Sequence, residues 1–369
     1  MMNKEFTVIE LFAGAGGLGL GLEAAGLKCV ALNEINHAAA STLRFNRPNW
    51  NVIEGDIKNI SFPELKGKID VVTGGFPCQA FSYAGKRLGF QDARGTLFYE
   101  FARIIKETMP PLCIGENVKG LLNHEKGKTL AGMISILDEI GYRVLQPHVL
   151  KAIHYDTPQK RERLVIVGIR KDIEIDFEYP KPNTNHILTL KDALKKGKLY
   201  KTDVPDSQGA KYPKRKKEIL DLVPPGGYWR DLPLEIQKEY MQQSFFLGGG
   251  KTGMARRISW DEPSLTLTCS PAQKQTERCH PDETRPFTVR EYARIQTFPD
   301  DWKFAGTVTE QYKQIGNAVP VNLGKAIGKS IVNFLEKLKH DRQKIQHTDL
   351  HKYIQSQQAL SAPAQLQII

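Results

Sequence analysis

The sequence predicts an α/β fold in which a mostly parallel, doubly wound sheet is joined to a second, smaller and irregular domain. Over the first 180 residues, short apolar runs typical of buried strands alternate with segments of helical spacing. Glycines or acidic side chains follow several of these runs directly. Between residues 181 and 304, periodicity is weak, and basic and glycine-rich stretches dominate. Because ligands bind at the carboxyl ends of strands in an open α/β sheet, residues in these positions are the candidates for a functional site.

Composition narrows the class of protein. The 369 residues carry a net charge of +11, which favours a polyanionic partner such as nucleic acid, although a basic surface that keeps a protein in solution has the same charge. The five cysteines include no CxxC pair, which argues against a disulfide framework and a structural zinc site, so no metal is expected. The N-terminus is too polar for a signal peptide, and no apolar run approaches membrane-spanning length. We therefore expect a cytoplasmic protein with no membrane partner.

The first predicted strand, residues 6–12, leads into a glycine-rich loop that continues as a helix. Backbone amides in such a loop can approach a ligand closely, and the helix N-terminus favours negative charge. Gly14, Gly16 and Gly19 satisfy the GxGxxG pattern, and Glu34 ends the second strand, where a carboxylate can accept both hydroxyls of a ribose. Taken alone, these features fit a NAD-dependent oxidoreductase as well as a protein that binds S-adenosylmethionine.

Two more strands place polar side chains at the same edge of the sheet. Residues 52–57 form a third strand with Asp56, which can accept from an adenine amino group or can equally cap a turn. Residues 69–73 form a fourth strand, and Cys78 follows its carboxyl end in a tight loop. A thiol in this position is a candidate nucleophile, although a lone cysteine at a turn is more often a small apolar residue. The glycine-rich stretch 83–92 is expected to form a loop over the site.

A carboxylate follows the fifth predicted strand, residues 111–115. Glu116 is expected to face the same crevice as Cys78, where it could protonate a ring nitrogen; a salt-bridged surface glutamate is the alternative. The next two strands, residues 142–150 and 163–170, are expected to form an antiparallel pair.

Two arginines lie between these last two strands. In an extended stretch, alternation places Gln159, Arg161 and Arg163 on one side. Two guanidinium groups on one face suit a phosphate or a carbonyl oxygen. A solvated, charged hairpin is the alternative.

The rest of the chain sets the expected domain boundaries. We expect a first domain over residues 1–180 that is completed by 305–338, a second, irregular domain with its hinge over 181–304, and a polar C-terminal tail over 339–369 that is a frayed helix or disordered. Within these limits the sequence predicts a strand over 264–268, a helix over 290–298, a tight turn over 316–320 and a helix over 322–338.

With these pieces in order, the chain resembles the DNA (cytosine-5) methyltransferases, and in particular those of bacterial restriction–modification systems. Each motif alone is weak, but eight of them occur in the order and spacing of that family. They are Phe12-Ala13-Gly14-Ala15-Gly16-Gly17, Glu34, Gly55-Asp56-Ile57, Pro77-Cys78-Gln79, Glu116-Asn117-Val118, Gln159-Lys160-Arg161-Glu162-Arg163, Arg290-Glu291 with Gln296-Thr297-Phe298-Pro299, and Gly316-Asn317-Ala318-Val319-Pro320.

The resemblance implies a Rossmann-like methyltransferase fold and a role for each matched residue. Cys78 would add to carbon 6 of cytosine, Glu116 would hold and protonate the ring, and Arg163, supported by Arg161, would bind the carbonyl oxygen. S-adenosylmethionine would be the cofactor, with Glu34 on its ribose and Asp56 on its adenine. The full set of cofactor-binding residues implied in this way is Phe12, Gly14, Gly16, Gly17, Leu18, Glu34, Ile35, Asp56, Ile57, Pro77, Leu97, Asn317 and Val319.

The resemblance also implies that the partner is DNA, and it leaves alternative functions to be weighed. The substrate would be double-stranded DNA whose target cytosine flips out of the helix, the protein would act as a monomer, and a restriction endonuclease could share its target. A tRNA methyltransferase is less favoured because more than a hundred residues separate Lys171 from Arg290, whereas such relatives have a reduced recognition region. A NAD-dependent oxidoreductase leaves Cys78 and Glu116 unexplained, and retention of the catalytic residues argues against an inactive DNA-binding relative.

Overall fold

The computed structural model describes residues 5–77 and 96–360, and the side chains as far as residue 343. In this part of the chain an eight-stranded sheet has the order β3-β2-β1-β4-β5-β9-β6, with β7 also paired to β9. Neighbours from β3 to β5 are parallel, whereas β9 is antiparallel to β5, β6 and β7. The strands are β1 (Phe6–Leu11), β2 (Leu27–Glu34), β3 (Val52–Glu54), β4 (Val71–Gly74), β5 (Leu112–Val118), β6 (Tyr142–Val144), β7 (His148–Lys151) and β9 (Glu162–Arg170).

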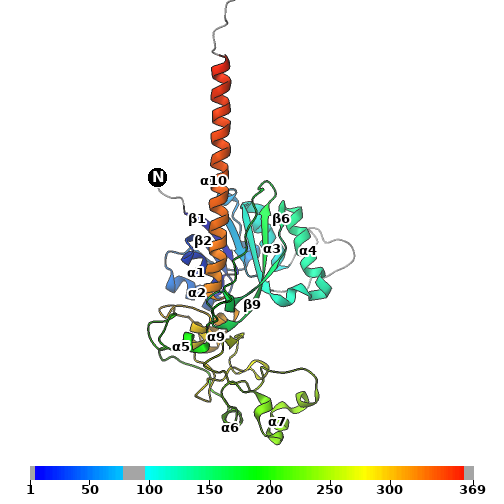
Figure 1. Ribbon diagram of the computed structural model, residues 1–369, viewed down its shortest axis with the longest axis vertical. Coiled ribbons are helices and arrows are strands. Elements are labelled where there is room, and N and C mark those ends of the chain that lie inside the picture. The colour runs from blue at the N-terminus through cyan, green and yellow to red at the C-terminus, as the bar shows by residue number, and fades with distance from the viewer. Residues whose placement is uncertain (1–4, 78–95, 361–369) are drawn as a thin grey trace, which may run out of the picture.

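Helices cover both faces of this sheet, as a doubly wound fold requires. Successive strand residues point to opposite faces, and Val8 and Ile9 of β1 accordingly belong to two different hydrophobic clusters. The first cluster packs α1 (Gly17–Ala24), α2 (His37–Asn46) and α10 (Val321–Leu360) against one face. The second packs α3 (Leu97–Thr108) and α4 (Lys128–Glu139) against the other (Figure 1). The predicted fold class is confirmed.

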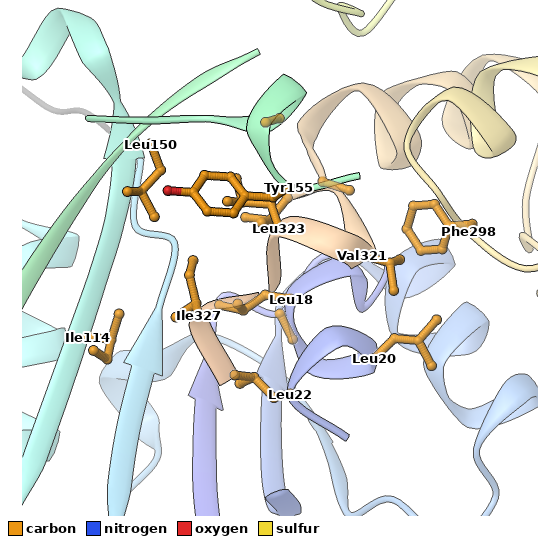
Figure 2. Packing of buried hydrophobic residues seen from close by; sticks show 14 of the residues in the cluster. Leu18, Leu20, Leu22, Ile114, Leu150, Tyr155, Phe298, Val321, Leu323 and Ile327 are labelled. Carbon is orange, nitrogen blue, oxygen red and sulfur yellow. The ribbon is translucent and has the colours of Figure 1, made fainter. Parts of the chain in front are cut away.

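Helices α1 and α10 pack backbone against backbone. A Cβ atom added at Gly21 would lie 2.5 Å from the amide nitrogen of Lys325 and 2.5 Å from the carbonyl oxygen of Val321. Leucines of α1, including Leu18 and Leu22, lie beside Ile327 of α10 around this contact (Figure 2). The end of the chain is therefore part of the core formed by its beginning.

The chain between β9 and α10 has little regular structure. Its helices are α5 (Leu190–Leu194), α6 (Lys214–Asp221), α7 (Leu234–Met241), α8 (Val289–Ile295) and α9 (Val308–Asn317). The two-residue strands β8 (Gln159–Lys160) and β10 (Ser264–Leu265) pair in parallel. A separate small hydrophobic cluster, with Leu220, Trp229 and Met241 among its members, holds α6 and α7 together at the far end of the molecule (Figure 1).

Several predicted element boundaries are wrong. The strand expected over 142–150 is divided into β6 and β7, because Pro147 between them has no amide hydrogen for a ladder. The strand expected over 264–268 is only two residues long, and the turn expected at Gly316 begins within the last residues of α9. Helix α8 stops at Ile295, before the left-handed Thr297 (φ 61°).

Beyond residue 339, where a frayed helix or disorder was expected, α10 continues as a helix to Leu360. Residues 339–360 contain neither glycine nor proline, so their composition allows the helix to continue although it is polar. No helix in the described ranges is both long enough and apolar enough to span a membrane.

A buried carboxyl group lies in the middle of the parallel sheet. Glu10 of β1 has a relative exposure of 2%, and its Oε2 atom has no hydrogen-bond partner among the described residues. Helix α1 packs directly against this carboxyl group. A Cβ atom added at Gly19 would lie only 2.3 Å from Oε2 of Glu10. Burial raises the pKa of Glu10 to about 8, and the neighbouring charge of Glu34 acts in the same direction. Glu10 is therefore largely protonated at neutral pH.

The Gly21→Ala substitution is expected to destabilise the protein by about 1–3 kcal/mol, because the added methyl group collides with the backbone of α10. Helix propensity alone predicts the opposite, a gain of about 1 kcal/mol. Chemical denaturation measures the difference. The control is Gly248→Ala, where an added Cβ atom meets nothing within 4 Å. Unchanged or increased stability of the Gly21 variant would refute this tight packing.

The Glu10→Gln substitution is expected to change how stability depends on pH. The pKa of Glu10 rises from 4.5 to about 8 on folding, so across this interval the folded protein keeps a proton that the unfolded chain has lost. The free energy of unfolding of the wild type should therefore decrease with rising pH over this range, and glutamine should remove this contribution. Urea unfolding of both proteins at pH 6 and pH 8.5 measures the difference. An equal pH dependence would show that Glu10 does not titrate in this way.

Candidate active site

A cleft of about 1040 Å³ opens at the carboxyl ends of the parallel strands. One wall consists of the loops that follow β1, β2, β4 and β5, and the other of residues 266–269 with the end of α9. Fifteen residues predicted from the sequence line it, namely Phe12, Gly14, Gly17, Leu18, Glu34, Ile35, Asp56, Ile57, Pro77, Leu97, Glu116, Arg161, Arg163, Asn317 and Val319. Gly16 does not line the cleft but precedes α1 as its N-cap. Cys78 and the loop 83–92 lie outside the described residues.

The glycine-rich loop has an unusual backbone. Phe12, Gly14 and Gly16 all have positive φ angles, of 58°, 57° and 84°. Glycine adopts this conformation readily, whereas for Phe12 it is strained and requires support from its surroundings. Gly17 allows a close approach, because a Cβ atom there would lie 2.2 Å from the carbonyl oxygen of Val319. Glycines of the loop thus leave backbone accessible beside the side chain of Phe12 at the cleft.

Hydrogen bonds to the Glu34 side chain connect this loop to the end of β2. Its Oε2 accepts a hydrogen bond from the amide of Gly14, and its Oε1 accepts one from the amide of Asn36, both at 2.7 Å. Each carboxylate oxygen has a second lone pair, so the group can still accept from two hydroxyls of a ligand. The carboxylate thus shapes the loop and remains available to a ribose.

Asp56 caps a turn, which is one of the two roles that the sequence suggested for it. Its Oδ1 accepts from the amide of Lys58 at 3.0 Å and caps the short 3-10 helix η1 (Ile57–Asn59). The residue also lines the cleft, next to Gly55, whose carbonyl oxygen accepts from Asn33 Nδ2 at 2.9 Å. The cap fixes the position of the carboxylate, and Oδ2 has capacity for a further donor.

Glu116 and Arg163 form a buried ion pair at the floor of the cleft. Arg163 Nε lies 2.6 Å from Glu116 Oε1, and each side chain is only 11% exposed. Burial raises the pKa of Glu116, while Arg163 and Arg161 partly offset this rise. The surface salt bridge considered for Glu116 is therefore wrong, and its carboxyl group takes up a proton more readily than an exposed glutamate.

Arg161 connects the strands to the other wall. Its Nη1 donates to the carbonyl oxygen of Leu267 at 3.0 Å, and its Nη2 donates to that of Gly316 at 2.8 Å. Burial lowers its pKa to about 9. Gln159, Arg161 and Arg163, which alternation placed on one side, are all buried, so the solvated hairpin is wrong. Because its guanidinium group donates to these two backbone carbonyls, Arg161 holds the wall formed by residues 266–269 and the end of α9 in place.

Sequence reasoning missed the residues that the small domain and α9 contribute. Thr266, Thr268, Cys269 and Lys313 line the cleft, and Cys269 Sγ donates to Asn317 Oδ1 at 3.0 Å. The alternating hydroxyl side chains of the strand expected over 264–268 were the signal that could have identified Thr266 and Thr268, whereas Cys269 and Lys313 follow no strong local pattern.

Asn117 was also missed as a site residue, although it stands inside a matched motif. Its Nδ2 donates to the carbonyl oxygen of Phe76 at 2.8 Å, which joins the end of β5 to the segment after β4. Its position directly after Glu116 was the signal that could have identified it.

Known proteins share both the sequence and the fold. A family model described as C-5 cytosine-specific DNA methylase matches residues 6–333. The Type II methyltransferase M.Eco47II of Escherichia coli is 66% identical over 338 residues, covering 91% of this chain and 81% of the relative. The Type II methyltransferase M.PspPI of a Psychrobacter strain is 63% identical over 334 residues, covering 90% of this chain and 80% of the relative.

A solved structure agrees at the level of the fold. The crystal structure of a putative DNA modification methyltransferase encoded within an E. coli prophage matches with a TM-score of 0.63. It has 24% sequence identity, and the match covers 90% of this chain and 99% of that one. The family model matches residues 6–333, and residues of six of the eight matched motifs line one cleft together with Pro77 of a seventh. The chain therefore belongs to the C-5 cytosine-specific DNA methylases and is a DNA (cytosine-5) methyltransferase.

Proposed function

We propose that this protein transfers a methyl group from S-adenosylmethionine to carbon 5 of a cytosine that is flipped out of a specific duplex DNA sequence. It would act as a monomer and protect host DNA from a cognate restriction endonuclease, in keeping with its Type II relatives. One observation carries the proposal. A single cleft joins the glycine loop and Glu34 to the Glu116–Arg163 pair and to Pro77, the residue before Cys78.

The cofactor end of the cleft fits S-adenosylmethionine. Gly14 and Gly17 line the cleft without a side chain, so a ligand could approach their backbone, and Glu34 keeps two acceptor positions for ribose hydroxyls. Asp56 would accept from the adenine amino group, while Ile35 and Leu97 provide apolar surface. When bound, S-adenosylmethionine supplies a methyl group on a sulfonium centre, which a carbon nucleophile can attack.

The other end of the cleft supplies the means to make cytosine carbon 5 nucleophilic. We assign the attack to Cys78, whose thiolate would form a bond to carbon 6. A free thiol has a pKa of about 8.5, so this step needs a setting that favours the thiolate. Glu116 would protonate ring nitrogen 3, and its raised pKa helps it to hold that proton near neutral pH.

Arg163 and Arg161 would have different roles in this addition to the cytosine ring. Arg163, in contact with Glu116, would donate to the carbonyl oxygen of the base, while Arg161 holds the wall at Leu267 and Gly316. After methylation, loss of the carbon 5 proton and cleavage of the bond between sulfur and carbon 6 restore the ring and free Cys78.

A base inside a stacked duplex cannot reach this cleft, so the target must leave the helix. The net charge of +11 favours DNA binding through its phosphates. The irregular region between β9 and α8 would supply the contacts that choose the target sequence.

The Cys78→Ser variant is expected to lose methyl transfer while it still binds cofactor and DNA, because a hydroxyl is a far weaker nucleophile than a thiolate. Transfer of labelled methyl groups to duplex DNA measures turnover, and calorimetry measures cofactor binding. DNA with 5-fluorocytosine at the target should trap the wild type covalently but not the variant. Turnover by the variant, or absence of the adduct in an active preparation, would refute this role of Cys78.

The Glu116→Gln variant is expected to reduce turnover at least about 100-fold, because glutamine cannot donate the proton. The matched control is Glu162→Gln on the neighbouring β9, where the carboxylate pairs with the exposed Lys119 Nζ at 3.0 Å. The control should retain turnover, and both variants should bind the cofactor normally. Similar turnover in the two variants would contradict the role of Glu116.

A further inference from the structure

A second pocket, of about 370 Å³, lies where the first turns of α10 face the chain after β7. We call it the lysine pocket. Its walls come from the 3-10 helix η5 (Ala152–His154) and the residues just after it, from the chain near Pro180, and from one face of α10. Among the described residues it shares no lining residue with the cleft. It is therefore a separate feature of the molecule.

Unpaired positive charge dominates this pocket. Lys181, Lys325 and Lys329 line it, and the four-residue spacing places the last two on the same face of α10. No carboxylate in the described part of the chain lies within 4 Å of these three ammonium groups. By contrast, Lys337 further along α10 pairs with Glu178. The lining lysines are thus available to an external anion.

Tertiary contacts hold the walls of the lysine pocket together. Asn322 Nδ2 of α10 donates to the carbonyl oxygen of Asp156 at 2.7 Å, and Tyr155 Oη donates to that of Pro180 at 2.9 Å. Tyr155 also packs against Leu323 inside the core (Figure 2). Asp156 has a left-handed backbone, with φ of 47°, and this contact to α10 supports it. These contacts fix the walls of the lysine pocket relative to one another, so the three lysines line a structured cavity.

The charges and donors of the lysine pocket match a phosphate group, and we infer that it binds one. Three lysines and the exposed carboxylate of Asp156 leave a net charge of about +2, which complements the −1.5 to −2 of a phosphate monoester near pH 7. Asn322 and Ser330 add polar side chains to the walls. His154 also lines the pocket, and its Nδ1 has no hydrogen-bond partner among the described residues.

Two sources could supply this phosphate group. One is the backbone of the bound DNA, which would reach the lysine pocket in addition to the cleft. The other is inorganic phosphate or a small phosphorylated molecule. The chemistry of recognition is the same for both, so the test needs an arm for each.

The test compares wild type with the double variant K325Q/K329Q and with the control K337Q/K339Q, which removes the same charge from α10 outside the pocket. In the first arm, thermal unfolding is measured in sodium phosphate and in sodium chloride at equal ionic strength. Phosphate should raise the melting temperature of the wild type and the control, and this rise should be lost in K325Q/K329Q. The melting curves also show whether each variant folds.

In the second arm, binding to a 40-base-pair duplex is followed as salt increases. If DNA phosphates occupy the lysine pocket, the slope of log K against log salt should fall by about 2 in K325Q/K329Q relative to the control. A change in the first arm alone identifies a free phosphate or a small phosphorylated molecule as the occupant, and a change in the slope identifies DNA. If K325Q/K329Q matches the control in both arms, the inference is overturned.

Discussion

The active-site cleft depends on the contact between the beginning of α1 and the segment that leads into α10. Gly17 lies so close to the carbonyl oxygen of Val319 that no side chain fits between them. This contact brings the glycine loop and the residues from Asn317 to Val319 into one cleft, although they lie near opposite ends of the sequence. Arg161 holds the same segment through the carbonyl oxygen of Gly316. The cofactor end of the site therefore forms only when both ends of the chain have packed together.

Two carboxyl groups along this cleft have different surroundings and therefore different chemistry. Glu10 is buried without a cation beside it, which raises its pKa to about 8. Glu116 is also buried, but Arg163 and Arg161 lie nearby and offset part of the rise in its pKa. A buried charge is costly unless a partner compensates it. Glu10 is therefore mainly neutral, whereas Glu116 has cations beside it that stabilise its charged form.

The same opening of strand, glycine loop and helix occurs in proteins with unrelated chemistry, so the fold alone does not choose the reaction. Gly14, Gly16, Gly19 and Glu34 would suit a dinucleotide equally well. The other half of the cleft separates the alternatives, because a buried Glu116–Arg163 pair lines it, to which we assign the binding and protonation of the cytosine ring. Family membership agrees with that half of the site.

The sequence by itself determined the local features. Glycines that require positive φ angles, apolar runs that end in Glu34, Asp56 or Glu116, and the alternation through Arg161 are all properties of a few consecutive residues. They predicted the fold class and identified residues that line the cleft, and they placed Gln159, Arg161 and Arg163 on one side. The tertiary structure decided what depends on contacts between distant segments. Arg161 engages Leu267 and Gly316, and Thr266 to Cys269 complete the second wall. Lys325 and Asp156 line the same pocket because their neighbours Leu323 and Tyr155 belong to one hydrophobic cluster, and no local pattern predicts such packing.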